Sequence, residues 1–173
     1  MDRRRRLDEQ TIRDFLAADY PRLVAAVALT CGSRAVAEDA VEEALARAWE
    51  RSERGERIQS LSAWVMKVAL NLVRSGFRRM RVERRIRSQL PTRDPRPTVA
   101  GAESAMDVAR ALAKLPRRQR EATVLRYYLD LDVREIASVL GVKEGTAKTT
   151  LHRARQALTA ALGVVEEDDR VEA

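Results

Sequence analysis

The stretch that decides the fold is DVREIASVLGVKEGTAKTTLHRAR, residues 132–155 of the chain. Its first half predicts a short helix, because Asp132 is a good N-cap and Glu135, three residues later, completes a capping box. Gly141 then ends that helix, since glycine adopts left-handed backbone at no steric cost. A second helix begins near Glu144, whose negative charge suits a helix N-terminus. Two helices joined by a tight turn at a glycine indicate a helix-turn-helix.

Both predicted helices have an apolar side. In the first helix this side holds Ile136, Ala137 and Leu140, and in the second it holds Ala147, Leu151, Ala154 and Leu158. The residues of the second helix that must then point outward are cationic or hydrogen-bonding: Lys148, Thr149, His152, Arg153 and Gln156. Thr146, in the first turn, is suited to a phosphate. Such a face suits contact with DNA phosphates and base edges, and the alternative is an ordinary solvated helix face.

The composition of the 173-residue chain agrees with an anionic partner. Lys and Arg number 33 against 26 Asp and Glu, which gives a net charge of +7. The start, residues 1–6, predicts a disordered basic arm, and there is no signal-peptide pattern or apolar run that would insert into a membrane. We therefore expect a protein of the reducing cytoplasm.

The cysteine and histidine content argues against an enzyme. Cys31 and His152 are each the only residue of their kind, so an internal disulfide is impossible and a structural zinc site lacks ligands. A Ser-His-Asp set would depend on His152 alone, and no glycine loop could cradle a phosphate. We expect no catalytic residues, no metal and no cofactor.

A segment rich in proline divides the chain in two. Prolines at this density prevent a continuous helix, and the breaking residues are Pro91, Pro95, Pro97 and Gly101. The predicted organisation is a helical domain over 9–86, a linker over 87–104, a smaller helical domain over 105–163 and an acidic tail over 164–173.

The first domain reads as three or four helices. One continuous helix before Gly32 is marked by Ile12, Leu16, Tyr20, Leu23 and Val27. A second helix, capped by Ser33, has a predicted core of Ala37, Ala40, Val41, Ala44, Leu45, Ala48 and Trp49. A third helix, capped by Ser60, buries Leu61, Trp64 or Val65, Val68 and Leu72, and then runs on into arginines. Those arginines indicate either a nucleic-acid contact or a solvated helix end.

The second domain opens with a helix over 105–115. Pro116 then fits the first turn of a helix that reaches Tyr128, with Ala122, Leu125 and Leu129 facing the core. Three arginines at the start of this helix either meet a DNA backbone or only add solubility: Arg117, Arg118 and Arg120.

Four motifs, in order, resemble those of the extracytoplasmic-function (ECF) sigma factors. AEDAVEEALARAW at 37–49 is similar to the family's AEDxxQExFxxAW, and WVMKVALNL at 64–72, followed by arginines, is similar to WLxxIAxNxxxDxxRR. The third motif is LPRRQRE at 115–121 with LRYY at 125–128. The fourth is the opening stretch, similar to EIAxxLGxxxGTVKSRLxRAR. The resemblance covers about residues 10–163.

The resemblance implies an all-α protein of two small helical domains joined by a flexible linker, the C-terminal one containing the helix-turn-helix. Such a protein binds core RNA polymerase, through its clamp and flap regions, and directs promoter-specific transcription initiation. It contacts promoter DNA in double- and single-stranded form. An anti-sigma factor is a further partner that the family allows.

The resemblance also implies site residues. Region two, over 9–86, would dock on the polymerase clamp through Asp39, Glu42, Glu43 and Arg47. It would read and open the minus-ten element through Lys67, Asn71, Arg74, Ser75, Arg78 and Arg79. Region four, over 105–163, would read the minus-thirty-five element through Thr146, Lys148, Thr149, His152 and Arg153.

Two departures from the family pattern lie in the second helix of the helix-turn-helix. Ala147 replaces a Val, and Thr150 replaces an Arg, which removes a cation from the side expected to face DNA. The bases that this chain reads therefore need not be those of its relatives.

Two other classes of protein compete with the sigma factor. A free-standing helix-turn-helix regulator would need a self-complementary apolar face and a palindromic site, and no obvious dimer helix is present. A purely structural adaptor would leave the outward Lys148, His152 and Arg153 unexplained.

Overall fold

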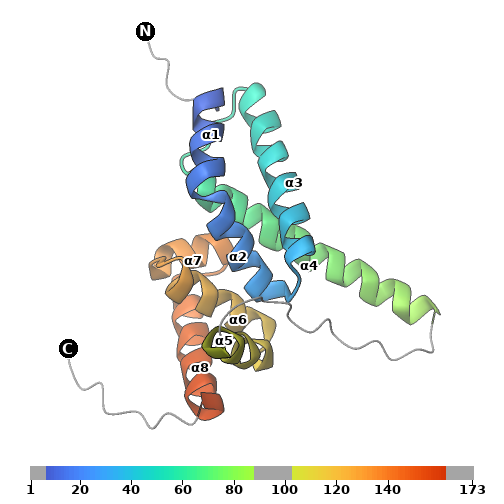
Figure 1. Cartoon of the computed structure of the whole chain (residues 1–173), viewed down its shortest axis with the longest axis vertical. Helices are drawn as coiled ribbons and strands as arrows, with labels where there is room; N and C mark the ends of the chain where they lie inside the picture. The colour runs from blue at the N-terminus through green and yellow to red at the C-terminus, as the bar shows by residue number, and fades with distance from the viewer. Residues whose placement is uncertain (1–6, 88–102, 163–173) are drawn as a thin grey trace. The chain divides into compact units, whose positions relative to one another are not determined.

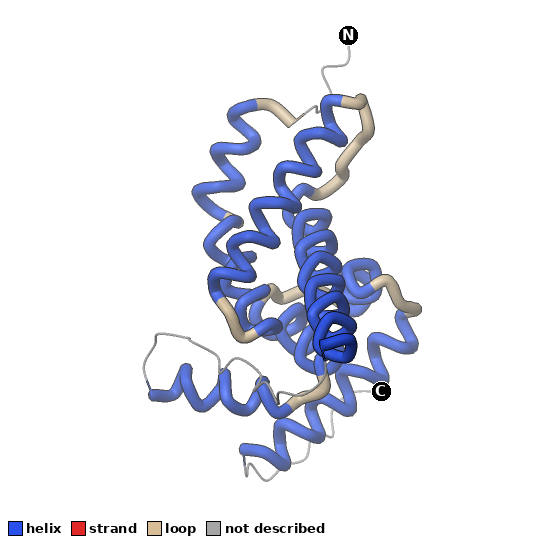
Figure 2. Tube along the Cα trace, turned by 90° about the vertical axis from the view of Figure 1, so that its right-hand side faces the viewer, coloured by secondary structure: helices blue, strands red, loops and turns tan. Residues whose placement is uncertain are grey.

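The structure is a computed structural model, which describes the backbone of residues 7–87 and 103–162. It describes the side chains of residues 7–79 and 107–161. Within these ranges every regular element is helical (Figures 1 and 2). The chain divides into two compact units, unit 1 over Met1–Val99 and unit 2 over Ala100–Ala173. An all-α fold of two helical units is therefore confirmed.

The predicted linker lies mostly outside the described residues, as do the basic arm and the acidic tail. The described helices nevertheless extend into both ends of the predicted linker, because α4 ends at Arg87 and α5 begins at Glu103.

Unit 1 contains four helices: α1 (Glu9–Ala18), α2 (Tyr20–Cys31), α3 (Arg34–Glu53) and α4 (Leu61–Arg87). Helix α3 packs against both α2 and α4, as Figure 1 shows. Four alanines of α3 face this core, which allows the neighbouring helices to approach closely: Ala37, Ala40, Ala44 and Ala48. The Ser33 cap is confirmed, since its Oγ accepts a hydrogen bond from the Val36 N–H at 3.4 Å.

The single first helix predicted by the sequence is wrong, because the chain breaks at Asp19 into α1 and α2. Pro21 lies in the first turn of α2, where its missing N–H costs nothing, whereas inside one long helix its ring would clash with the preceding turn. Asp19 is held in place by a hydrogen bond from Ser62 Oγ to its Oδ2 at 2.6 Å. The buried residue of α1 is Phe15, whereas Leu16, one of the residues that marked the predicted helix, is exposed.

The predicted core of α4 is also shifted. The Ser60 cap is confirmed by a 3.3 Å hydrogen bond from the Ala63 N–H to Ser60 Oγ. The buried residues that follow are Val65, Met66, Ala69, Leu70 and Val73. Of the two alternatives Trp64 and Val65, Val65 is the buried one, and the other predicted core residues are only half-buried: Leu61, Val68 and Leu72. The apolar residues of α4 cover a wider face of the helix than the part that is buried. Their spacing alone therefore did not predict which of them lie at the centre of the buried face.

Unit 2 contains α5 (Glu103–Lys114), α6 (Arg117–Thr123), a π-helical turn η1 (Val124–Tyr128), α7 (Val133–Leu140) and α8 (Glu144–Leu162). The helix expected from Pro116 to Tyr128 is therefore α6 continued by η1. Its predicted core residues, Ala122, Leu125 and Leu129, are buried. The wide turn was not predicted, and it closes with a hydrogen bond from the Leu129 N–H to the Val124 carbonyl at 3.2 Å.

The helix-turn-helix is confirmed in detail. The Asp132 carboxylate accepts from the Glu135 N–H, and the Glu135 carboxylate accepts from the Asp132 N–H, both at 2.8 Å. Gly141 has the left-handed φ of 67° that ends α7. The Val142 N–H then reaches back to the Ala137 carbonyl at 2.9 Å, which closes the helix end before α8 begins.

Candidate DNA- and protein-binding surfaces

Helix α8 presents a basic face opposite its buried side. Ala147 and Ala154 are buried and Leu151 and Leu158 are half-buried, so the predicted stripe is on the inner side. The predicted outward residues are all exposed: Thr146, Lys148, Thr149, His152, Arg153 and Gln156. We call this set, without Gln156, the α8 face. Its cations and hydroxyls can pair with phosphates and base edges.

Thr150 lies at the border of the α8 face and is half-buried, and not on the outward side as expected. Its hydroxyl donates to the Thr146 carbonyl at 2.7 Å, and that of Thr149 donates to the Gly145 carbonyl at 2.9 Å. Both hydroxyl protons are therefore used inside the helix, and the oxygens remain as acceptors.

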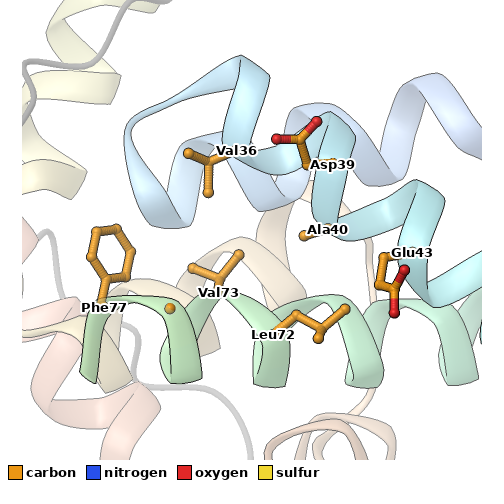
Figure 3. A pocket seen from close by; sticks show the side chains of 8 residues that line it. Val36, Asp39, Ala40, Glu43, Leu72, Val73 and Phe77 are labelled. Carbon is orange, nitrogen blue, oxygen red and sulfur yellow. The ribbon is translucent and has the colours of Figure 1, made fainter. Parts of the chain in front are cut away.

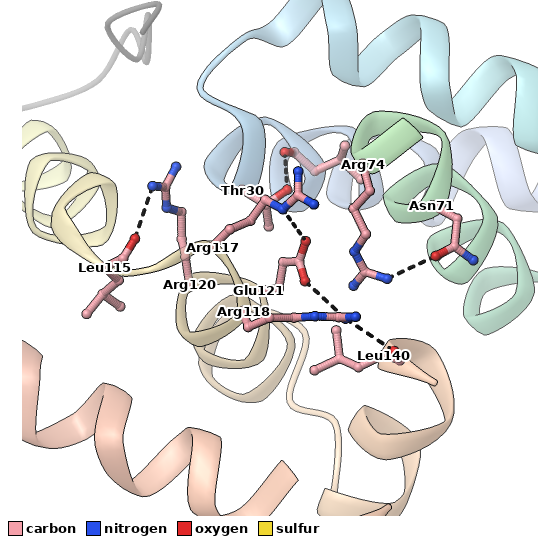
Figure 4. A network of polar contacts seen from close by, with 10 residues as sticks. Thr30, Asn71, Arg74, Leu115, Arg117, Arg118, Arg120, Glu121 and Leu140 are labelled. Atoms are coloured by element: carbon pink, nitrogen blue, oxygen red, sulfur yellow. Dashed lines mark hydrogen bonds and ion pairs between the residues drawn. The ribbon is translucent and has the colours of Figure 1, made fainter. Parts of the chain in front are cut away.

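Helix α4 carries a second polar stripe on the side away from the core. Lys67, Asn71, Arg78 and Arg79 are exposed, while Arg74 and Ser75 are half-buried. The spacing places Lys67, Asn71, Arg74 and Arg78 along one line of the helix. Arg74 Nη1 donates to Asn71 Oδ1 at 2.9 Å, as Figure 4 shows, so the amide group of Asn71 is turned with its N–H donors free for other acceptors.

Helix α3 presents an acidic face to the outside. Its predicted partner-binding residues, Asp39, Glu42, Glu43 and Arg47, are all exposed. Arg47 Nε pairs with Glu43 Oε1 at 2.8 Å, and the Tyr20 hydroxyl donates to Glu42 Oε1 at 2.9 Å. Burial first, and then the Glu42 carboxylate, raise the pKa of Tyr20 above its ordinary value of 10.0.

Two apolar grooves flank the outward face of α3 that holds Asp39, Glu42, Glu43 and Arg47, which we call the α3 face. One, of about 430 Å³, lies between α3 and α4, with Asp39 and Glu43 at its edge (Figure 3). It is lined by Val36, Ala40, Leu72, Val73, Gly76 and Phe77. The other, of about 550 Å³, lies between α1 and α3, with Glu42 at its edge. Its apolar lining is Ile12, Leu16, Leu45, Ala46 and Trp49.

Sequence reasoning missed the exposure of Leu16 and Trp49. Trp49 was predicted as core and Leu16 as part of the apolar pattern of the first helix, but Leu16 is 45% exposed and Trp49 is 41% exposed. They lie in the groove between α1 and α3, where large apolar side chains are typical of a protein interface. Their spacing is that of a buried stripe, so no local signal separated them from the true core.

The three arginines of α6 have partners within unit 2. Arg120 Nη2 donates to the carbonyls of Ala113 and Leu115, at 3.0 and 3.2 Å, at the end of α5. Arg117 and Arg118 flank the buried Glu121 (Figure 4). These contacts lie within unit 2, and the two alternatives that the sequence offers for the arginines, contact with a DNA backbone or added solubility, stay predictions.

No described helix is long and apolar enough to cross a membrane.

Comparison with protein families gives two matches. The model of sigma-70 region 2 matches residues 16–83, and that of sigma-70 region 4 matches residues 105–158.

Among curated relatives, the chain is 32% identical over 161 residues to the ECF RNA polymerase sigma factor EcfG of Rhodopseudomonas palustris, covering 92% of this chain and 89% of the relative. It is 36% identical over 132 residues to the ECF RNA polymerase sigma factor SigL of Mycobacterium tuberculosis, covering 73% and 75%.

Two solved structures are similar. One is the sigma factor RpoE in complex with the anti-sigma factor NepR, from Bartonella quintana, with a TM-score of 0.73 and 25% identity over 92% of this chain and 100% of that chain. The other is CnrH in complex with the cytosolic domain of CnrY, with a TM-score of 0.65, 22% identity and 92% coverage of both chains. The second likeness concerns the fold alone.

Proposed function

The chain belongs to the ECF RNA polymerase sigma factors, and from that premise we propose how its two units divide the work of promoter-directed transcription initiation. Unit 1 docks on core polymerase and opens the minus-ten element, while unit 2 reads the minus-thirty-five element. The corresponding boundaries are 9–86 and 105–163, joined by the linker 87–104.

The observation that carries the proposal is the separation of opposite charges onto different helices. Helix α3 exposes carboxylates beside two apolar grooves, which suits a protein partner with basic and apolar side chains. The α8 face exposes cations and hydroxyls opposite buried alanines, which suits DNA. A sigma factor needs both kinds of surface in one chain.

We assign the polymerase contact to the charged residues of the α3 face and extend it to the groove between α1 and α3. Asp39, Glu42, Glu43 and Arg47 supply charge that selects and orients the clamp. Leu16 and Trp49 supply apolar area, since large exposed side chains near an interface centre carry much of its binding energy.

We assign DNA contacts to two helices. In unit 2 the α8 face enters the major groove, where Arg and Lys pair with guanine and phosphates. In unit 1 the α4 stripe contacts the minus-ten element, through Lys67, Asn71, Arg74, Ser75, Arg78 and Arg79. The free amide N–H donors of Asn71 can bond to an unpaired base there.

The family is not a class of enzymes, and the proposed activity involves no covalent chemistry and no cofactor. It takes place in the cytoplasm, where core polymerase and the chromosome meet. The solved relative from Bartonella quintana is bound by an anti-sigma factor. We include a partner of that class in the proposal, because both acidic and basic faces would be available to it before polymerase binds.

Reconstitution with core RNA polymerase and a genomic DNA library, followed by transcript start mapping, tests the proposal. We expect start sites that appear only when this protein is added, with shared sequence elements near minus ten and minus thirty-five. Specific DNA binding by a dimer without core polymerase, and no protein-dependent start sites, would favour the free-standing regulator instead.

A further inference from the structure

Unit 2 contains a buried carboxylate in α6. Glu121, in the last turn of α6, is 1% exposed. Two arginines of the same helix approach it, with Arg118 Nη1 at 3.6 Å and Arg117 Nε at 3.7 Å. A buried carboxylate is costly unless cations and hydrogen bonds compensate it, so these arginines are constrained in where they can point.

Arg118 also reaches a second helix. Its Nη1 donates to the Leu140 carbonyl at 3.2 Å, 22 residues further along the chain, as Figure 4 shows. Leu140 is the last residue of α7, and the carbonyls of a final helical turn have no partner within their own helix. The guanidinium therefore caps α7 from outside while its charge faces Glu121.

The capped carbonyl directly precedes the turn of the helix-turn-helix. Gly141 follows it, and α8 begins three residues later at Glu144. The turn has hydrogen bonds of its own, from the Val142 N–H to the Ala137 carbonyl and from the Ala147 N–H to the Lys143 carbonyl. A fixed Leu140 carbonyl thus helps to set where the first turn of α8 begins, and base contacts need that placement to within about 0.5 Å.

We propose that Glu121, Arg118 and the Leu140 carbonyl form a positioning relay that fixes the turn and thereby the entry of the α8 face into the DNA groove. Glu121 and Arg118 are positioning residues, and neither needs to touch DNA. The consequence for DNA binding rests on the proposed reading of the minus-thirty-five element by α8. The fixing of the turn by Glu121 and Arg118 does not depend on that proposal.

Two other roles for these residues make different predictions. If Arg118 bound a phosphate, replacing it with a neutral residue would reduce the salt dependence of DNA binding. If Glu121 only stabilised unit 2, its loss would lower the stability of the whole unit evenly, with no special effect at the turn. Glu121 is the cleaner test residue, because a side chain so deeply buried can affect DNA only through other residues.

The first measurement is amide hydrogen exchange on the full-length chain, comparing wild type with Glu121→Gln and Arg118→Lys. Gln keeps the shape of Glu but not its charge, and Lys keeps the charge of Arg but not its fork. We expect exchange at Val142 and Ala147 to rise about tenfold relative to Ala154, the change that one charge-assisted hydrogen bond accounts for. The matched control, Arg117→Lys, faces Glu121 from the same helix and should change these amides by less than about twofold.

The second measurement is binding to a duplex that carries the mapped upstream element and to a shuffled duplex. We expect Glu121→Gln to weaken binding to the specific duplex about tenfold and to leave the shuffled duplex and the salt slope unchanged. The relay is overturned if Glu121→Gln shows the same exchange at Val142 and the same preference for the specific duplex as wild type. This test stands even if Arg118→Lys fails to fold. An even rise in exchange across α6, α7 and α8 would also overturn it.

The two proposals fail in different ways. If wild type shows no preference for any mapped duplex, the assignment of α8 to the minus-thirty-five element fails. The exchange measurement then still decides whether Glu121 and Arg118 fix the turn.

Discussion

The outward faces of α3 and α8 differ in what surrounds their charges. The carboxylates of α3 stand beside two grooves lined with apolar side chains. The cations of the α8 face stand among hydroxyls and an imidazole, opposite a buried stripe of small residues. Binding to a protein gains affinity from apolar area at the centre of the interface, whereas binding to DNA gains affinity from charge and hydrogen-bonding groups. The surroundings of a charge thus indicate its partner better than its sign does.

The largest effect should follow from reversing the charge of the α3 face. The double variant Asp39→Lys with Glu43→Lys should weaken binding to core polymerase by roughly 3 kcal/mol, because like charges would then face each other across the interface. The affinity for core polymerase can be measured by fluorescence anisotropy of the labelled chain. Unit 2 should keep its exchange pattern, and an unchanged affinity for core would refute the assignment of α3.

A second test asks whether the apolar groove matters as much as the charge beside it. Trp49→Ala should weaken core binding by about 2 kcal/mol, as expected for an aromatic anchor near an interface centre. Because Trp49 is partly exposed, the stability of the free protein in urea should fall by much less. A large loss of stability with normal core affinity would return Trp49 to the core, where the sequence had placed it.

On the α8 face, Arg153→Ala should cost about 1–3 kcal/mol of promoter binding if Arg153 pairs with a base, and should relax the preference for one base pair. Lys148→Ala should weaken all sequences alike and lower the salt slope by about one if Lys148 binds a phosphate. Binding isotherms at several salt concentrations separate the two. Both variants should still assemble with core polymerase, and loss of assembly would mean that the face was misassigned.

Two glycines with open space around them provide a matched comparison of the units. Gly141 has a φ of 67°, and an added Cβ would meet nothing within 4 Å there or at Gly76. Gly141→Ala should destabilise unit 2 by about 1 kcal/mol, because L-residues avoid this backbone conformation. Gly76→Ala, inside α4, should instead stabilise unit 1 by about 0.5–1 kcal/mol. Urea unfolding, followed separately in each unit, measures both changes in stability. If the two substitutions changed the free energy of unfolding in the same direction, the argument from backbone conformation would be contradicted.

The smallest effect concerns the hydrogen bond from Tyr20 to Glu42. The raised pKa of Tyr20 means that the folded state favours the protonated phenol. Its contribution to stability is therefore complete below about pH 10 and is lost as the pH rises through the folded pKa. Tyr20→Phe should remove this dependence from urea unfolding curves recorded between about pH 9 and pH 11. A wild-type curve that matches Tyr20→Phe over this range would contradict the prediction.

Local signals made much of the fold predictable. The capping box at Asp132, the glycine that ends α7, and the Ser33 and Ser60 caps act within four residues of the chain, and all were found as expected. The break at Asp19 shows the limit of periodicity, because an apolar pattern can continue across a proline that interrupts the helix.

The sequence by itself determined the two helices of the helix-turn-helix, the caps at Ser33, Ser60 and Asp132, and the outward direction of the α8 face, because each depends on residues close by in the chain. Only the tertiary structure decided which apolar residues stay uncovered, as Leu16 and Trp49 do, and where the α6 arginines point. Arg118 meets a carbonyl 22 residues away, and such a contact depends on how whole helices pack. The burial of an apolar side chain and the contacts between distant residues depend on how the helices pack in the folded unit. The spacing of residues along the chain does not reveal them.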